Sequence, residues 1–290
     1  MFAHQVIEEL TRTANSLSEM GIVNDYSKHI SATIPIIRKS IKFHISDENE
    51  MLYFRKSAFG KEAVFMEMAN YIKLPYPNIY VDYICDDSKA EEKVRVAKIA
   101  ATMSAFKDNI LRVNFMAFSE HHQRWFLAPQ SYIIKVGGFL DSKTSSNIAM
   151  VSAYPFTDGE KDKIIKEDTS DLVILNSFLL LLNCKNVITD KVPAPEALNK
   201  KRRKAGKQEI FDYHVLNVVV PSSKREYREA TIPLSHNRVH LCRGHFKEYT
   251  AEHPLFGKYT GLYWWQPHVR GQNKDGIVMK DYRVSNKETP

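Results

Sequence analysis

The chain has few cysteines and no long apolar run. Three cysteines are widely separated, Cys85, Cys184 and Cys242. An odd number without a repeated spacing argues against a disulfide framework, so we expect a reducing, cytosolic compartment. The longest apolar stretch, residues 172–182, is shorter than the ~20 residues that cross a bilayer. The first residues also lack the charged start and apolar core of a signal peptide. We therefore expect no membrane partner.

Several sequence motifs of catalysis and cofactor binding are missing as well. Neither glycine-rich phosphate-binding pattern is present, and no G-x-S-x-G element marks a nucleophile. His240, Cys242 and His245 are possible zinc ligands. No C-x-x-C or H-x-x-x-H pair completes such a set. The sequence therefore predicts no metal and no cofactor.

Positive charge is concentrated in the C-terminal part. The chain has a formal net charge of +7, and residues 200–290 hold 18 basic and 9 acidic residues. The first 199 residues then hold 23 basic and 25 acidic residues. Such asymmetry favours an anionic partner, either nucleic acid or an acidic protein surface. A basic face that only keeps the protein soluble is the alternative.

Hydrophobic periodicity predicts an α+β fold. Helical spacing covers residues 4–20, 28–41, 59–72 and 161–182. Strand patterns cover 78–84, 110–118, 125–136 and 148–156, while 92–106 fits either a strand or a helix. Further strands are expected at 210–220, 229–233, 238–246, 261–266 and 277–284. Helices and strands are segregated, so we expect N-terminal helices with an antiparallel sheet of four or five strands, a long central helix and a C-terminal antiparallel β-rich unit.

The boundary between two domains is expected near the segment VPAP, residues 192–195, which forms a stiff extended connection. We therefore predict an α+β domain over residues 1–192 and a basic, aromatic β-rich domain over 193–290.

A run of six cations lies within eight residues at the start of the second domain. The run comprises Lys200, Lys201, Arg202, Arg203, Lys204 and Lys207. It can bind phosphates by releasing their counterions, or it can be a loop with solvated charges. Gly206 argues against a continuous helix here.

A block of arginine, histidine and tryptophan residues follows. On the expected strand 238–246, side chains alternate between two faces, and Arg238, His240 and Cys242 share one of them. Arg243 and His245 share the other face, and His268 and Arg270 follow the next strand. Histidine can act as general acid or base and arginine can stabilise a phosphorane. The alternative is that these groups pair internally at the margin of a sheet.

Trp264 and Trp265 are adjacent on an expected strand and so face opposite sides. One is expected in the core. The other can stack on a base or anchor a protein interface, together with Tyr259. Core or sheet-covering roles for all of them are the alternative.

The C-terminal motifs resemble a family of phage and prophage proteins. They are LNKKRRKAGK, RVHLCRGHF, PLFGK, YWWQPHVRG and KDYRV, within residues 198–284. The resemblance implies a phage product acting in the host bacterial cytoplasm. Phage proteins of this length include the Gabija anti-defence proteins, which assemble around a host nuclease complex and block its access to DNA.

Two functions remain open. The first is a non-catalytic, homo-oligomeric anti-defence protein that binds and blocks a host nuclease defence complex. Its expected partner-binding residues are Lys200, Lys201, Arg202, Arg203, Lys204, Arg238, Arg243, Tyr259, Trp264, Trp265 and Arg270. The second is a metal-independent protein that binds or cleaves nucleic acid through His240, His245, His268 and Arg243. We favour the first, because no catalytic motif is complete.

Overall fold

The computed structural model describes residues 1–45, 73–86, 96–107, 110–135, 148–219, 238–242, 245–265, 268–270 and 272–277. The chain divides into two compact units: a first unit of residues 1–183 and 188–217, and a second unit of 184–187 and 218–290. Residues 193–217 thus belong to the first unit. The expected domains, 1–192 and 193–290, stay a prediction, because compactness does not show which segments fold independently.

The first unit is built on a mixed sheet of eight strands, most of which pair antiparallel. Their spatial order is β6 (Ile148–Ser152), β5 (Arg124–Lys135), β4 (Ile110–Ser119), β3 (Val96–Lys107), β2 (Asn78–Asp86), β1 (Ile41–Ile45), β8 (Tyr213–Val218) and β7 (Val187–Val192). Strand β1 runs parallel to both of its neighbours. The expected four or five antiparallel strands therefore form part of a larger, mixed sheet.

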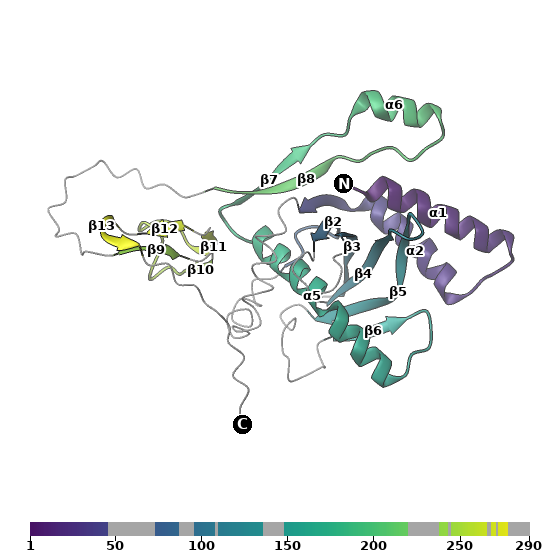
Figure 1. Ribbon diagram of the computed structural model, residues 1–290, viewed down its shortest axis with the longest axis horizontal. Helices are drawn as coiled ribbons and strands as arrows, with labels where there is room; N and C mark the ends of the chain where they lie inside the picture. Colours follow the sequence, from purple (N-terminus) through teal and green to yellow (C-terminus); the bar gives the residue numbers. More distant parts are fainter. Residues whose placement is uncertain are drawn as a thin grey trace. The chain divides into compact units, whose positions relative to one another are not determined.

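Helices cover both faces of this sheet (Figure 1). Helices α1 (Ala3–Glu19) and α2 (Asp25–Lys39) pack on the face that carries Tyr80, and α5 (Asp158–Leu182) lies on the opposite face. Phe178 of α5 contacts Phe43 at a ring-centroid distance of 5.2 Å. Because side chains alternate along a strand, the adjacent residues Lys42 and Phe43 face different helical layers.

Apolar side chains from α1, α2 and the sheet form one core cluster. Val6, Ile7 and Leu10 of α1 and Ile30 and Ile37 of α2 belong to this cluster, at spacings of one or two helical turns, as expected for amphipathic helices. Each of these side chains is at most 1% exposed, and burying one contributes roughly 1.5–3 kcal/mol.

Several boundaries differ from those expected. Helix α2 begins earlier because Asn24 and Ser27 form a capping box, and it ends earlier because Ile41 starts β1. Most of the ambiguous segment 92–106 lies in strand β3, whose residues 96–104 pair with β2. The expected helix at 59–72 and strand at 229–233 lie outside the described residues.

The second unit contains two small sheets. One pairs β10 (His245–Tyr249) with β11 (Gly261–Trp265) antiparallel. The other has β9 (Arg238–Cys242) between β12 (His268–Arg270) and β13 (Gln272–Ile277). The expected strand 238–246 is therefore two strands in different sheets, so the assignment of its residues to shared faces is wrong beyond Cys242. Strand β13 also runs parallel to β9, so this part of the fold is not purely antiparallel.

No helix of the described residues combines the length and the apolar character needed to span a membrane.

Candidate functional site

The first five cations of the basic run lie on a helix, which ends before Gly206 and leaves Lys207 outside it. Helix α6 (Glu196–Lys204) begins after Pro195, with an acidic residue in its first turn and four basic residues in its last. These charges complement the helix dipole. Gly206 ends the helix with φ +64. The N–H groups of Gly206 and Lys207 close on the carbonyls of Arg203 and Arg202, which is a Schellman motif.

The inner face of α6 is bonded to the rest of the first unit. The buried Asn199 amide donates to the Ile210 carbonyl at 2.8 Å and accepts from the Ile210 N–H at 2.7 Å. One turn later, Arg202 donates to the Gln208 carbonyl at 2.7 Å and to Glu8 of α1 at 2.6 Å. These bonds fix the position of α6 relative to α1.

Arg203 is held by two carboxylates on the flank of α6. Its guanidinium donates to Glu209 at 2.9 and 3.0 Å and to Glu196 at 3.3 Å. Hydrogen bonds to Glu209 and Glu196 raise the pKa of Arg203, so it stays charged. Because the group is exposed, the pairs contribute little to stability.

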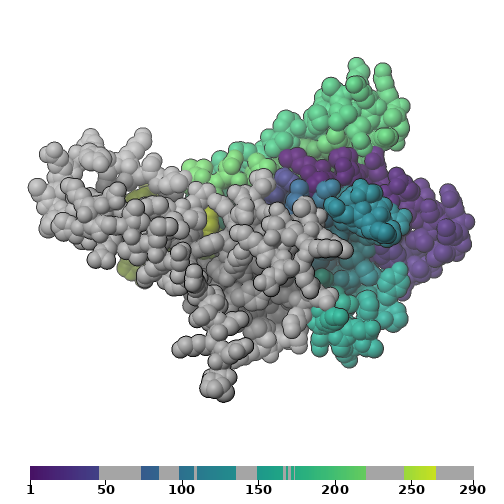
Figure 2. All heavy atoms as spheres, in the orientation of Figure 1, coloured from purple at the N-terminus to yellow at the C-terminus, as the bar shows by residue number. Residues whose placement is uncertain are grey.

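Three lysines occupy the outer face of α6. Lys200, Lys201 and Lys204 are exposed, and none has an ion-pair partner among the described residues. Helical periodicity places them opposite Asn199 and Arg202. Figure 2 shows the green segment that contains α6 on the outside of the first unit, beside the purple N-terminal helices.

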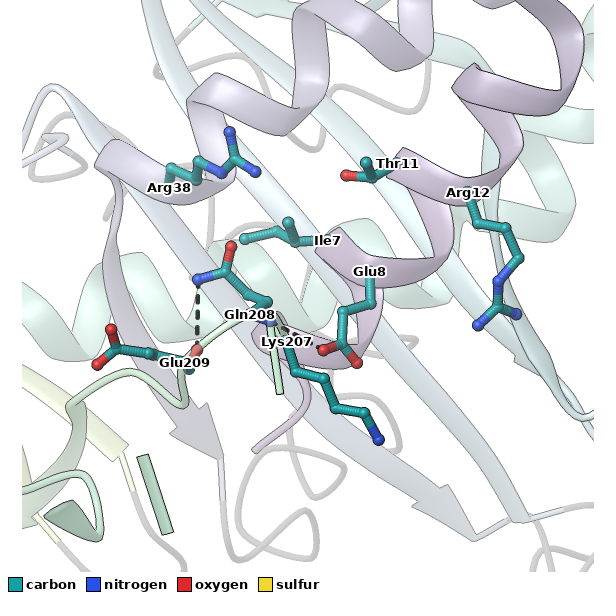
Figure 3. Close-up of a pocket in the computed structure, with 9 residues that line it drawn as sticks. Ile7, Glu8, Thr11, Arg12, Arg38, Lys207, Gln208 and Glu209 are labelled. Carbon is teal, nitrogen blue, oxygen red and sulfur yellow. Dashed lines mark hydrogen bonds between the residues drawn. The ribbon is translucent and has the colours of Figure 1, made fainter. Parts of the chain in front are cut away.

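A groove of about 600 Å³ lies between α1 and the segment that follows α6. We call it the α1–α6 groove. Its lining residues are Ile7, Glu8, Thr11, Arg12, Arg38, Gly206, Lys207, Gln208 and Glu209. In Figure 3 the Arg38 guanidinium and the Thr11 hydroxyl lie at its rim with Ile7 between them, while Arg12 points away.

The acidic residues of the groove are already bonded. Glu8 accepts from Arg202 and from the Gln208 N–H at 3.0 Å, and Glu209 accepts from Arg203. Arg38 and Lys207 then provide positive charge in the groove. Burial, followed by the nearby charge of Arg202, lowers the pKa of His4.

No match was found for this chain among protein-family models, curated proteins or solved structures.

The aromatic residues of the C-terminal block differ in exposure. Trp264 is 2% exposed, Tyr259 is 40% exposed and Trp265 is intermediate. The Asn186 side-chain amide donates to the Trp264 carbonyl at 2.7 Å and accepts from the Trp264 N–H at 2.9 Å. It thus pairs with the Trp264 backbone as a residue of a neighbouring strand would. Tyr259 and Trp265 thus keep solvent-exposed surface, whereas Trp264 is buried.

The arginines and histidines of this block are divided between sheets. The register of β9 and β12 places His240 opposite Arg270 and Cys242 opposite His268. Arg238 lies opposite Gln272 of β13. His245 is exposed and lies in the other sheet, opposite Trp265. Arg243 lies outside the described residues.

Asp82, a buried carboxylate with several bonded partners, is not among the site residues predicted from the sequence. This carboxylate is 0% exposed. It accepts from the Phe2 N–H at 2.5 Å and the Tyr213 hydroxyl at 2.8 Å, and lies 2.6 Å from Nδ1 of His44. The only sequence signal was a charged residue within an apolar strand, in YVDYI. In the described part of the chain no three His, Cys, Asp or Glu residues are grouped to hold a metal.

Proposed function

We propose that this protein is a binding protein without catalysis of its own, which docks on an acidic surface of a protein complex through α6. The observation that carries the proposal is the contrast between the two faces of α6. Asn199 and Arg202 bond to the protein itself, whereas Lys200, Lys201 and Lys204 have no ion-pair partner among the described residues. A helix held in place by Asn199 and Arg202 loses little backbone conformational entropy on binding, which favours recognition.

The C-terminal motifs supply the setting of the proposal. A phage product in the host bacterial cytoplasm would meet host defence nucleases, and the partner we propose is such a nuclease complex. A mimic of DNA would be acidic, so a basic protein instead fits an acidic patch on the complex itself. Homo-oligomerisation would strengthen attachment, because several copies bind one complex together.

The test removes the three outer lysines together. We expect Lys200→Ala, Lys201→Ala and Lys204→Ala combined to weaken capture of the defence complex by about tenfold, since rim charges set the association rate and its salt dependence. The measurement is a binding titration at several salt concentrations, alongside protection of phage in a defended host. The variant should also show a shallower salt dependence.

The control removes three lysines elsewhere on the first unit. Lys28, Lys107 and Lys161 are exposed or half-buried and lie outside α6. Their combined replacement by alanine changes the net charge equally and should leave binding unchanged. Equal weakening by both triple variants would mean that net charge, not α6, drives binding.

A second candidate function rests on the register of β9 and β12. Placing His240 opposite Arg270 favours a phosphate site that binds or cleaves nucleic acid, with His245, His268 and Arg243 as further candidates. The purified protein should then cleave RNA or DNA without added metal, and His240→Ala should abolish cleavage with folding intact. Absence of cleavage with and without metal would remove the nuclease form of this candidate.

A further inference from the structure

A second cavity, of about 400 Å³, lies beside α5 and the bulge of β5. Asn114 pairs with Ser131, whereas Met116 pairs with Leu127, so residues 128–130 bulge from β5 opposite a single residue. Pro129 in the bulge has no N–H for the ladder, and its carbonyl accepts from the Ala153 N–H at 2.9 Å. We call this cavity the bulge pocket. Its volume lies within the usual range for small-ligand sites.

A carboxylate held by uncharged donors lines the bulge pocket. Asp168 accepts at 2.5 Å from the Tyr132 hydroxyl and at 3.1 Å from the Gln130 amide, both at Oδ2. Both of its partners within the described residues are uncharged. Burial and the nearby Asp168 charge raise the pKa of Tyr132, so Tyr132 remains a donor. Asp171, one turn along α5, also lines the pocket and accepts from the Tyr83 hydroxyl at 2.8 Å.

Aromatic rings form other walls of the bulge pocket. Tyr26 and Tyr154 stack with ring centroids 5.6 Å apart, and Phe115 and Phe126 also line the cavity. The guanidinium of Arg124 already lies 4.8 Å from the Phe126 ring centroid. The face of an aromatic ring is negative and attracts cations, and aromatic enclosures commonly bind organic ammonium groups.

We propose that the bulge pocket is a binding site for an organic cation of the guanidinium or alkylammonium class. The carboxylate of Asp168 supplies the opposite charge, and the tyrosine and phenylalanine rings supply apolar walls that also favour a cation. A phosphate or carboxylate would meet repulsion from Asp168 and Asp171. The bulge pocket thus favours cations, whereas the outer face of α6 favours anions. The proposal is independent of the function assigned to α6.

The test titrates the full-length protein with agmatine by calorimetry, using N-butylacetamide as a neutral comparator. Agmatine should bind and the neutral amide should not. Asp168→Asn keeps an acceptor for Tyr132 but removes the charge, and should weaken agmatine binding about tenfold or more. Asp162→Asn, on the exposed side of α5, is the matched control and should bind as the wild type does.

A peptide comparison identifies the source of the cation, and a second variant tests the site where folding should be preserved. If an Ac-Gly-Arg-Gly-NH2 peptide binds more tightly than agmatine, the site takes an arginine of a partner chain. If agmatine binds more tightly than the peptide, the site takes a free small cation. Tyr154→Leu changes a ring that is 45% exposed, so folding should survive while agmatine binding falls about threefold. The proposal fails if neither cation outcompetes the neutral amide, or if Asp168→Asn and Tyr154→Leu both bind like the wild type.

Discussion

At the scale of single residues, buried polar groups on one face of the sheet join α1 to three strands. Asp82 of β2 bonds the Phe2 backbone, His44 of β1 and Tyr213 of β8. Tyr213 in turn accepts from the Ala3 N–H at 2.7 Å. Burial, followed by the charge of Asp82, raises the pKa of Tyr213. Each of these hydrogen bonds offsets the desolvation cost of burying its polar groups, because a buried polar group without a partner costs about 1–3 kcal/mol.

Lys42, two residues before His44 on β1, makes a pH-dependent contribution to stability. It is 4% exposed, and burial lowers its pKa from 10.5 to about 8. Below pH 8 the amine is charged in both states, so the folded state bears the full desolvation cost. Between pH 8 and 10.5 the folded state loses the proton first. The stability of the wild type should therefore rise relative to Lys42→Met over this range, by about 2–3 kcal/mol.

The measurement is denaturant unfolding of both proteins at several pH values. Lys39→Met provides the control, because Lys39 is exposed at the end of α2 and should show no such dependence. If the free energies of unfolding of the wild type and Lys42→Met differ by the same amount at every pH in this range, the lowered pKa of Lys42 is contradicted.

At the scale of elements, the C-terminal end of α6 and its bonds to the rest of the first unit determine which of its charged side chains face solvent. Gly206 ends the helix within the run of cations, because glycine is the residue best suited to end a helix in the left-handed conformation. The five preceding cations consequently lie on a helix. Bonds from Asn199 and Arg202 then select which face of that helix turns outward.

Two glycine substitutions should have opposite effects on stability. Gly206→Ala forces a side chain into a backbone with φ +64 and should destabilise the protein by about 1–2 kcal/mol. Gly159 lies in the first turn of α5, with nothing within 4 Å of an added Cβ. Gly159→Ala should therefore stabilise by about 0.5–1 kcal/mol. Thermal unfolding of both variants checks this, and equal signs would refute the assigned cap geometry.

At the scale of the whole molecule, the two compact units differ in their internal support. All described helices belong to the first unit, where they cover a large sheet. The described part of the second unit consists of short strands, with Trp264 held by the Asn186 amide. Short strands without covering helices bury less apolar area than a helix-covered sheet. We therefore expect the second unit to be less stable than the first.

Asn186→Ala should separate the unfolding of the two units. Loss of both bonds to Trp264 should destabilise the second unit by about 2–3 kcal/mol. In a Trp125→Phe background, tryptophan fluorescence reports Trp264 and Trp265, while helical circular dichroism reports the described helices of the first unit. Only the fluorescence transition should shift to lower temperature. Asn217→Ala, at an exposed position on β8, serves as the control, and a joint shift of both signals would show one cooperative fold.

The sequence by itself determined the α+β class, most strands of the large sheet and the long helix α5. These follow from local periodicity, which depends only on neighbouring residues. It also determined where the cations are concentrated. The parallel placement of β1, the division of 238–246 between two sheets, and the partners of Asp82 were decided by tertiary structure. Tertiary structure also decided that Arg202 bonds to α1 while Lys200 faces outward, and that Asp168, Tyr26 and Tyr154 line one cavity. Such contacts join residues far apart in the chain, and periodicity carries no information about which distant segments meet.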